Sequence, residues 1–212
     1  MDILITRPDH DDTVTYLSLW AGEIVKRAKC SGNVFDYAGK KANKKEIEKL
    51  LKKRNPRFVF FNGHGNEKTI FGQGDQPLIK EGENEELLAS KIVYSRACNS
   101  AKSLGKSACE NGADAYIGYK GEFTFFTDTS SECTPLRDKF AEPFFKSSNE
   151  IAESLIKGNT VSEAYDKSQA TFDKWIGKFS SSGAPVGSET IIWALYADKE
   201  NQIFHGNKGA AL

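Results

Sequence analysis

Short continuous apolar runs alternate along this chain with segments of helical spacing. The runs cover residues 3–5, 58–61, 92–94 and 115–119, and such runs are typical of strands buried in a sheet. Between the first two runs, apolar residues recur three and four positions apart from Val14 to Ala28, which predicts an amphipathic helix. Strands that alternate with helices predict right-handed crossovers and a mostly parallel sheet covered on both faces, an α/β fold.

Local patterns place the remaining elements. Residues 136–179 are expected to be largely helical, and Thr160 with Glu163 resembles a capping box at a helix start. The Gly-rich stretch from residue 63 to 80 predicts a small hairpin or an excursion from the sheet. The apolar and aromatic run of residues 190–197 predicts a last strand.

Composition and charge limit the class of protein. The chain has 212 residues, with 29 basic and 29 acidic side chains, so one compact domain spanning 1–212 is expected, with no overall field for nucleic acid or an anionic membrane. No apolar stretch approaches the roughly 20 residues that span a bilayer, and the N-terminus has no signal-peptide pattern. These features predict a cytoplasmic protein without a membrane or nucleic-acid partner.

The four cysteines lie far apart in the sequence, with no C-x-x-C spacing. This argues against a structural zinc site and against a disulfide framework, so at least one thiol is expected to be free. Cys30, Cys109 and Cys133 are expected to be packed or incidental. Cys98 is different because it follows a predicted strand.

His64 and Cys98 follow two neighbouring predicted strands, and the carboxyl ends of parallel strands meet at one edge of a sheet. We therefore expect the imidazole and the thiol to lie side by side, with His64 as the base for a Cys98 nucleophile. The N–H groups of Gly65 and Cys98 are candidates for an oxyanion hole. The simpler alternative is that Cys98 is a packed thiol and His64 a turn residue.

These segments resemble the two catalytic blocks of the caspase-like cysteine peptidases of clan CD. Residues 58–65 match a strand followed by His-Gly, and residues 92–98 match a strand followed by Ala-Cys. The segment from Ala97 to Ser100 is most similar to the CHAT branch, which includes the separase-like peptidases. The resemblance spans about residues 58–119.

The resemblance implies a three-layer α/β/α sandwich and a cysteine endopeptidase that acts on a protein or peptide, with no cofactor and no metal. In many members the position two before the cysteine lines the pocket for the side chain preceding the cleaved bond, and here it is Arg96. Arg7 follows the first strand, similar to the place from which caspases supply a pocket arginine. These two residues predict a preference for an acidic side chain. Glu122 and Asp128 are the rivals, because either would favour Arg or Lys substrates or neutralise Arg96.

Other functions remain open. A catalytically silent caspase-like module could bind a regulatory protein partner, and a doubly wound nucleotide-binding domain would share the strand and helix alternation, although the phosphate-binding glycine loop is missing. The segment from Asp9 to Asp12 is interpreted as helix capping rather than a metal site. His10 and His205 are interpreted as surface residues without partners.

Polar and aromatic residues beside the two blocks have their own interpretations. Asn62 and Asn99 are expected to form turns. Three phenylalanines after the fourth run are expected to form an apolar wall for substrate or a partner-binding patch. They are Phe123, Phe125 and Phe126.

Overall fold

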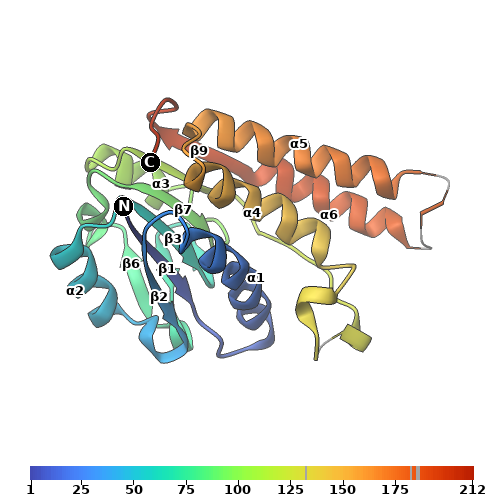
Figure 1. Cartoon of the computed structure of the whole chain (residues 1–212), viewed down its shortest axis with the longest axis horizontal. Coiled ribbons are helices and arrows are strands. Elements are labelled where there is room, and N and C mark those ends of the chain that lie inside the picture. Colours follow the sequence, from blue (N-terminus) through green and yellow to red (C-terminus); the bar gives the residue numbers. More distant parts are fainter. Residues whose placement is uncertain (132, 182, 185–186) are drawn as a thin grey trace.

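A six-stranded sheet forms the centre of the molecule in the computed structural model, which describes residues 1–131, 133–181, 183–184 and 187–212 (Figure 1). The strand order is β2-β1-β3-β7-β8-β9, and every neighbouring pair is parallel except β8 and β9. The strands are β1 (Asp2–Arg7), β2 (Asn33–Ala38), β3 (Phe58–Asn62), β7 (Ile92–Arg96), β8 (Ala115–Tyr119) and β9 (Gln202–Gly206).

Helices cover both faces of this sheet (Figure 1). They are α1 (Asp12–Ala28), α2 (Lys44–Arg54), α3 (Leu104–Glu110), α4 (Glu142–Ile156), α5 (Val161–Phe179) and α6 (Ser188–Asn201). Side chains alternate along each strand, so Ile3 and Ile5 pack with α1 and α4–α6 while Leu4 packs with α2 and α3. The fold is therefore the expected three-layer α/β/α sandwich with a mostly parallel central sheet.

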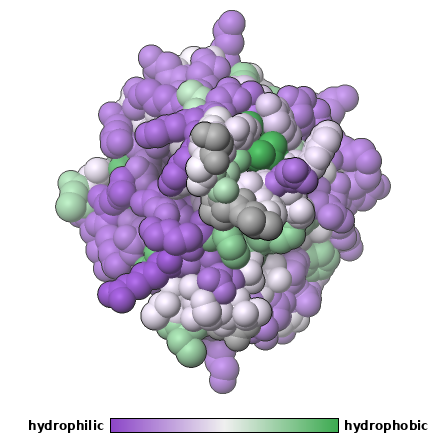
Figure 2. All heavy atoms as spheres, turned by 90° about the vertical axis from the view of Figure 1, so that its right-hand side faces the viewer, coloured by the Kyte–Doolittle hydropathy of each residue, from purple (hydrophilic) through white to green (hydrophobic). Residues whose placement is uncertain are grey.

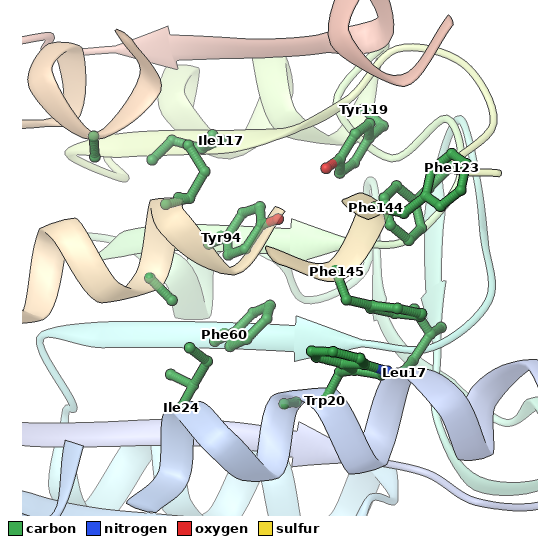
Figure 3. Close-up of a cluster of buried hydrophobic side chains, with 14 of the residues drawn as sticks. Leu17, Trp20, Ile24, Phe60, Tyr94, Ile117, Tyr119, Phe123, Phe144 and Phe145 are labelled. Atoms are coloured by element: carbon green, nitrogen blue, oxygen red, sulfur yellow. The ribbon is translucent and has the colours of Figure 1, made fainter. Parts of the chain in front are cut away.

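Aromatic rings fill the layer between the sheet and helices α1 and α4 (Figure 3). Trp20 stacks on Phe145 with ring centroids 5.3 Å apart, and Phe60 stacks on Tyr94 at 4.7 Å. All four side chains are at most 3% exposed. Aromatic pairs in such geometry add to the stabilisation that burial alone provides.

A second, three-stranded antiparallel sheet lies between β3 and β7 in the sequence, as the Gly-rich stretch predicted. Its strands are β4 (Gly65–Asn66), β5 (Thr69–Phe71) and β6 (Pro77–Lys80). The first of these strands begins directly after His64, so the small sheet fixes the chain as it leaves β3.

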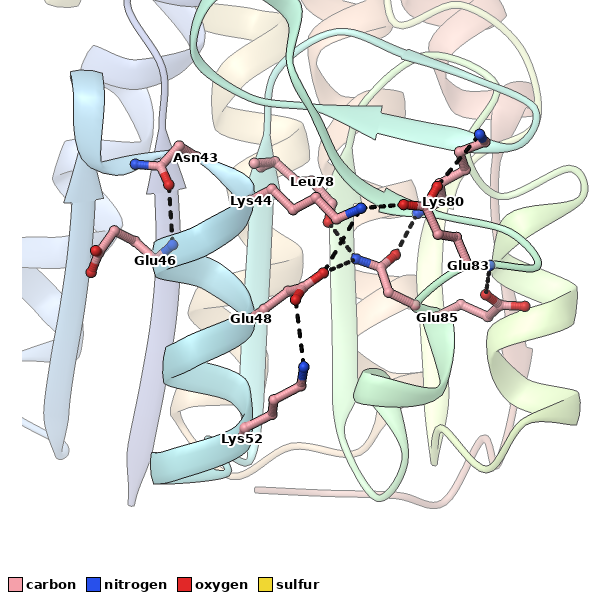
Figure 4. Close-up of polar contacts among 10 residues, drawn as sticks. Asn43, Lys44, Glu46, Glu48, Lys52, Leu78, Lys80, Glu83 and Glu85 are labelled. Carbon is pink, nitrogen blue, oxygen red and sulfur yellow. Dashed lines mark hydrogen bonds and ion pairs between the residues drawn. The ribbon is translucent and has the colours of Figure 1, made fainter.

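Polar contacts fasten this small sheet to α2 (Figure 4). Asn43 caps the helix by accepting the Glu46 N–H at 3.1 Å. The buried Asn84 donates to Glu48 Oε1 and to Leu78 O, each at 3.0 Å. These contacts therefore hold the three-stranded sheet against α2, on the face of the central sheet that α2 and α3 cover.

Residues 190–197 form a helix, so the predicted strand is wrong. Ile191 and Leu195 are buried one turn apart, whereas Trp193 is 75% and Tyr196 45% exposed, which is a helical and not an alternating pattern. The β-branched and aromatic composition of the run favoured a strand locally. Instead, β9 pairs with the edge of β8, so tertiary packing overrode the local preference of residues 190–197 for a strand.

At the end of the molecule that carries the connection between α5 and α6, the surface is mostly hydrophilic with scattered apolar side chains (Figure 2). Among the described residues, no helix combines the length and apolar character needed to cross a bilayer.

Candidate functional site

His64 and Cys98 lie beyond the ends of adjacent parallel strands, β3 and β7. The last paired residues of the two strands are Asn62 and Arg96, opposite each other, and each candidate residue follows its strand by two positions. Paired strands lie about 4.8 Å apart, so the segments that follow β3 and β7 begin close together. Both residues are brought to the carboxyl edge of the sheet.

Gly65 permits close contact between the two segments. A Cβ atom at this position would lie 2.7 Å from Cys98 O and 2.8 Å from Ala97 Cβ, so any larger residue would push the strand ends apart. The chain before it also requires glycine, because Gly63 has a φ of +147° and a Cβ there would lie 2.3 Å from Phe71 O. The glycines on both sides of His64 therefore hold the turn and the contact with the Cys98 segment.

Asp11 holds the imidazole of His64, with His64 Nε2 2.8 Å from Asp11 Oδ2. The other carboxylate oxygen of Asp11 accepts the Val14 N–H at 2.9 Å and caps α1. Burial raises the pKa of Asp11, but the Val14 N–H and the imidazole lower it by more, so the net pKa lies below its usual value. Asp11 was predicted only to cap a helix, and the fold brings it to His64 as well.

The thiol of Cys98 is partly buried beside the loop that follows β8. Its Sγ lies 4.0 Å from Phe123 O, the carbonyl that it faces. Burial raises the pKa of Cys98, a backbone contact at Phe123 lowers it by less, and the charge of Glu122 raises it further. In this conformation the sulfur is held as the protonated thiol.

The backbone around Cys98 forms a tight turn. Asn99 has a φ of +60° and donates its N–H to Gly121 O at 2.8 Å, so Asn99 forms a turn as predicted. In the described part of the chain, no other residue accepts the N–H of Cys98. That donor remains available at the strand end.

Arg96 does not line a pocket, and the prediction that it contacts substrate is wrong. The side chain is fully buried and packs between the rings of Phe60 and Phe145, with its Cζ 5.3 and 5.0 Å from their centroids. Burial lowers the pKa of Arg96 to about 10. Its hydrogen-bond acceptors are Asn62 Oδ1 (2.7 and 3.0 Å), Ser148 Oγ (2.9 Å), Asn149 Oδ1 (2.9 Å) and Leu17 O (3.1 Å).

Asn62 belongs to the same buried network, which the turn interpretation missed. Its side chain accepts from Arg96 and donates to Thr6 O at 3.0 Å, linking β1, β3 and β7. Arg96 lies on the face of β7 that is packed against α1 and α4, and Cys98, two positions later, also contacts that layer.

Two of the other three predicted pocket residues, Arg7 and Asp128, bond to groups of this chain. Arg7 forms a bidentate ion pair with Asp36, with both nitrogen–oxygen distances 2.7 Å. Asp128 accepts the Ser130 N–H at 2.9 Å, and Glu122 is exposed. Neither acidic residue pairs with Arg96, whose acceptors are all neutral.

A cavity of about 420 Å³ lies between the start of α1 and the loop after β8. His64 and Cys98 do not line it, but residues in or next to the lining contact both of them: Asp11, which contacts His64, precedes Asp12, and the lining residue Phe123 has its carbonyl 4.0 Å from Cys98 Sγ. The lining residues are Asp12, Thr13, Thr15, Tyr16, Phe123, Thr124, Phe125, Thr127 and Pro135. Phe123 and Phe125 line this cavity, while Phe126 packs against Phe144 with centroids 6.2 Å apart. A role of these rings in binding substrate or a partner stays a prediction.

Two histidines interpreted as lone surface residues have partners. The His10 ring lies 6.0 Å from the His64 ring and its Nε2 lies 3.2 Å from Asp75 Oδ1. His205 Nε2 lies 2.7 Å from Ala101 O. These contacts could not be predicted because the partners come from segments distant in the sequence.

All four cysteines are free thiols. Cys30 and Cys133 are exposed, so they are incidental rather than packed, and Cys109 is partly buried, which raises its pKa to about 11. Cys98 is less exposed than Cys30 and Cys133 and falls in the same partly buried class as Cys109, so only its position after β7 distinguishes it from Cys109.

Comparison with known proteins identifies the fold. No protein-family model matches the sequence, and no curated protein matches it. The chain is similar to the X-ray structure of a secreted C11 cysteine protease from Bacteroides thetaiotaomicron in complex with an irreversible peptide inhibitor, with a TM-score of 0.52 and 13% identity. The match covers 89% of this chain and 62% of that chain, so this chain corresponds to less than two thirds of its neighbour. The likeness shows a shared fold, the caspase-like three-layer arrangement, and does not distinguish the CHAT and separase-like branch.

Proposed function

We propose that the protein is a cysteine endopeptidase that cleaves peptide bonds with a Cys98 and His64 dyad. The observation that carries this proposal is the placement of both residues two positions beyond the opposed ends of β3 and β7, with Gly65 in contact with the Cys98 backbone. The carboxyl edge of a parallel sheet is where this architecture collects reactive side chains.

The chemistry follows from the groups at that edge. His64 accepts the proton of Cys98 as the sulfur attacks the substrate carbonyl carbon, and the carbonyl oxygen becomes an anion. The N–H groups of Cys98 and Gly65 stabilise that anion. The carbon–nitrogen bond then breaks, His64 gives its proton to the leaving amine, and water hydrolyses the thioester.

Asp11 acts in this scheme as a positioning residue. Its carboxylate fixes the imidazole from the side of α1 and stabilises the imidazolium that forms during attack. Because the pKa of Cys98 is raised, proton transfer accompanies attack rather than preceding it as a stable ion pair.

The cavity beside the pair is our candidate for the side chain that precedes the cleaved bond. Arg96 and Arg7 are both engaged within the protein, which removes the physical basis for an acidic preference. Asp12 is the charged residue of the lining, and the rest is threonine, aromatic or proline. We therefore propose a neutral or basic side chain there, and cleavage profiling on a peptide library tests it, since a strict preference for Asp or Glu would contradict it.

Labelling with a peptide-based irreversible inhibitor tests the dyad. Mass spectrometry should find the inhibitor on Cys98, with labelling lost in Cys98→Ala and strongly reduced in His64→Ala. Cys109→Ala is the matched control and should be labelled like the wild type. Simple alkylation is not diagnostic because Cys30 and Cys133 are more exposed than Cys98.

A catalytically silent module that binds a protein partner is the second candidate. The raised pKa of Cys98 and the contact of its sulfur with Phe123 O favour it, since the resting thiol is not activated. This candidate requires that no peptide of any sequence be cleaved and that the inhibitor leave Cys98 unmodified. Membership of the CHAT branch and a cytoplasmic location stay predictions.

A further inference from the structure

Four possible metal ligands gather beside the proposed dyad, from three segments of the chain. One ligand atom each from His10, His64 and Asp75 lies within 4.8 Å of the others. Asp11 adds a fourth, with its Oδ2 2.8 Å from His64 Nε2 and 3.7 Å from His10 Nε2. His10 Nε2 in turn lies 3.2 Å from Asp75 Oδ1.

These separations match the edges of a metal coordination shell. Four ligands at about 2.0–2.1 Å from a tetrahedral Zn²⁺ lie about 3.3 Å from one another. Three of the separations, 2.8, 3.2 and 3.7 Å, bracket that value, and the ligand atoms of His10, His64 and Asp75 all lie within 4.8 Å of one another, so side-chain shifts that close the wider separations would admit an ion. Two imidazoles with carboxylates favour Zn²⁺ over Mg²⁺ and Ca²⁺, which prefer oxygen ligands.

The site is also partly formed in advance. The His10 side chain is only 16% exposed and packs edge-on against His64, with an interplanar angle of 77°. Asp11 is fixed as the cap of α1. Asp9 N–H donates to Gln73 Oε1 at 2.9 Å, which ties the His10 loop to the loop that carries Asp75.

We propose that His10, His64 and Asp75, assisted by Asp11, bind Zn²⁺ and that the bound ion switches off the dyad. An imidazole with a metal on one nitrogen carries its proton on the other, so it has no lone pair left to accept the Cys98 proton. The inhibitory part of this proposal rests on the proposed peptidase function, whereas the binding of the ion does not.

Metal binding is measured on the full chain carrying Cys98→Ser, which excludes coordination by that thiol. We expect one Zn²⁺ per chain by calorimetry, and Co²⁺ should give the visible spectrum of a four-coordinate nitrogen and oxygen site without thiolate charge transfer. His10→Gln and Asp75→Asn should each weaken Zn²⁺ binding by about tenfold or more, as loss of a ligand does. His205→Gln is the matched control, because His205 is bonded to Ala101 O instead, and it should bind like the parent.

The outcomes separate the two proposals. Absence of a one-to-one site, or equal affinity in His10→Gln and Asp75→Asn, would overturn the metal site whether or not the protein cleaves peptides. In the active protein, Zn²⁺ should suppress cleavage, and the ratio of rates without and with Zn²⁺ should fall in His10→Gln. One-to-one binding in a protein that cleaves nothing would support the site and reject the peptidase. Binding without inhibition of an active enzyme would overturn the switch.

Discussion

Asp11 serves two neighbours with its two carboxylate oxygens, the first turn of α1 and the imidazole of His64. Arg96 likewise has several neighbours. Its guanidinium donates hydrogen bonds to α1, α4 and β3, and the rings of Phe60 and Phe145 lie over its two faces. Substitutions can therefore separate the capping and positioning roles of Asp11, and can test whether Arg96 is structural.

Asp11→Asn separates the two roles of that residue. Asparagine caps a helix about as well as aspartate, so the free energy of unfolding should change little. The neutral amide cannot stabilise the imidazolium that forms during attack, so kcat/KM should fall by at least about tenfold. Asp9→Asn, on the same exposed loop, is the control, and an equal loss of activity there would reject the role of Asp11.

Arg96→Met tests whether the guanidinium is structural. It leaves buried acceptors on Asn62, Ser148 and Asn149 without a donor, which should lower the free energy of unfolding by about 3 kcal/mol or more in urea denaturation. Arg137→Met, at an exposed position, should cost less than about 0.5 kcal/mol. A stable Arg96→Met protein with altered substrate preference would instead return Arg96 to the substrate pocket.

At the scale of elements, the strands and the crossover helices could be predicted from the apolar runs and the helical spacing, since each run is long enough to be buried on both faces. The placement of His64 and Cys98 at one edge followed from the topology alone. The direction of Arg96 could not be predicted, because alternation along β7 gives a shared face but not what packs on it. The strand predicted for residues 190–197 was wrong for a similar reason, because local sequence does not show which segment pairs with the edge of β8, and β9 occupies that edge.

Helix α6 is joined to the loop after β8 by Asp198, which is fully buried and accepts the Thr124 N–H at 2.8 Å. Burial raises the pKa of Asp198 well above its usual value, with partial opposition from the Thr124 N–H. The folded protein therefore binds a proton that the unfolded chain releases at lower pH. This contribution to stability is complete below the unfolded pKa, near 3.8, and is lost as the pH rises through the folded pKa.

Asp198→Asn should remove that pH dependence. The amide keeps an acceptor for the Thr124 N–H but does not ionise, so the variant should unfold at higher denaturant than the wild type near neutral pH, and the gap should close toward pH 4. Urea denaturation across this range measures it, with Asp173→Asn on exposed α5 as control. A gap that widened toward acid pH would contradict the buried, protonated state of Asp198.

Across the whole molecule, the fully buried central strands contrast with a candidate pocket built from a helix start and a loop. Local stability generally follows such differences in burial. Residues 58–62 and 92–96 should therefore be the slowest to exchange amide hydrogen, and residues 127–131 among the fastest.

Binding of the irreversible peptide inhibitor should slow exchange at residues 123–125 and 127, which line the cavity, while α2 on the opposite layer should not change. Hydrogen exchange followed by mass spectrometry gives both readings. Protection confined to α2 or to the α5–α6 end would place substrate somewhere other than the cavity.

His64 and Cys98 each lie two residues beyond the end of a strand in the same sheet. Their separation is fixed by the hydrogen-bonded sheet, whereas the cavity walls come from segments outside it. An engineer could exchange the loop after β8 to change which peptides are accepted without rebuilding the reactive centre. A single inserted residue between Asn62 and His64, by contrast, would abolish the chemistry while sparing every wall of the pocket.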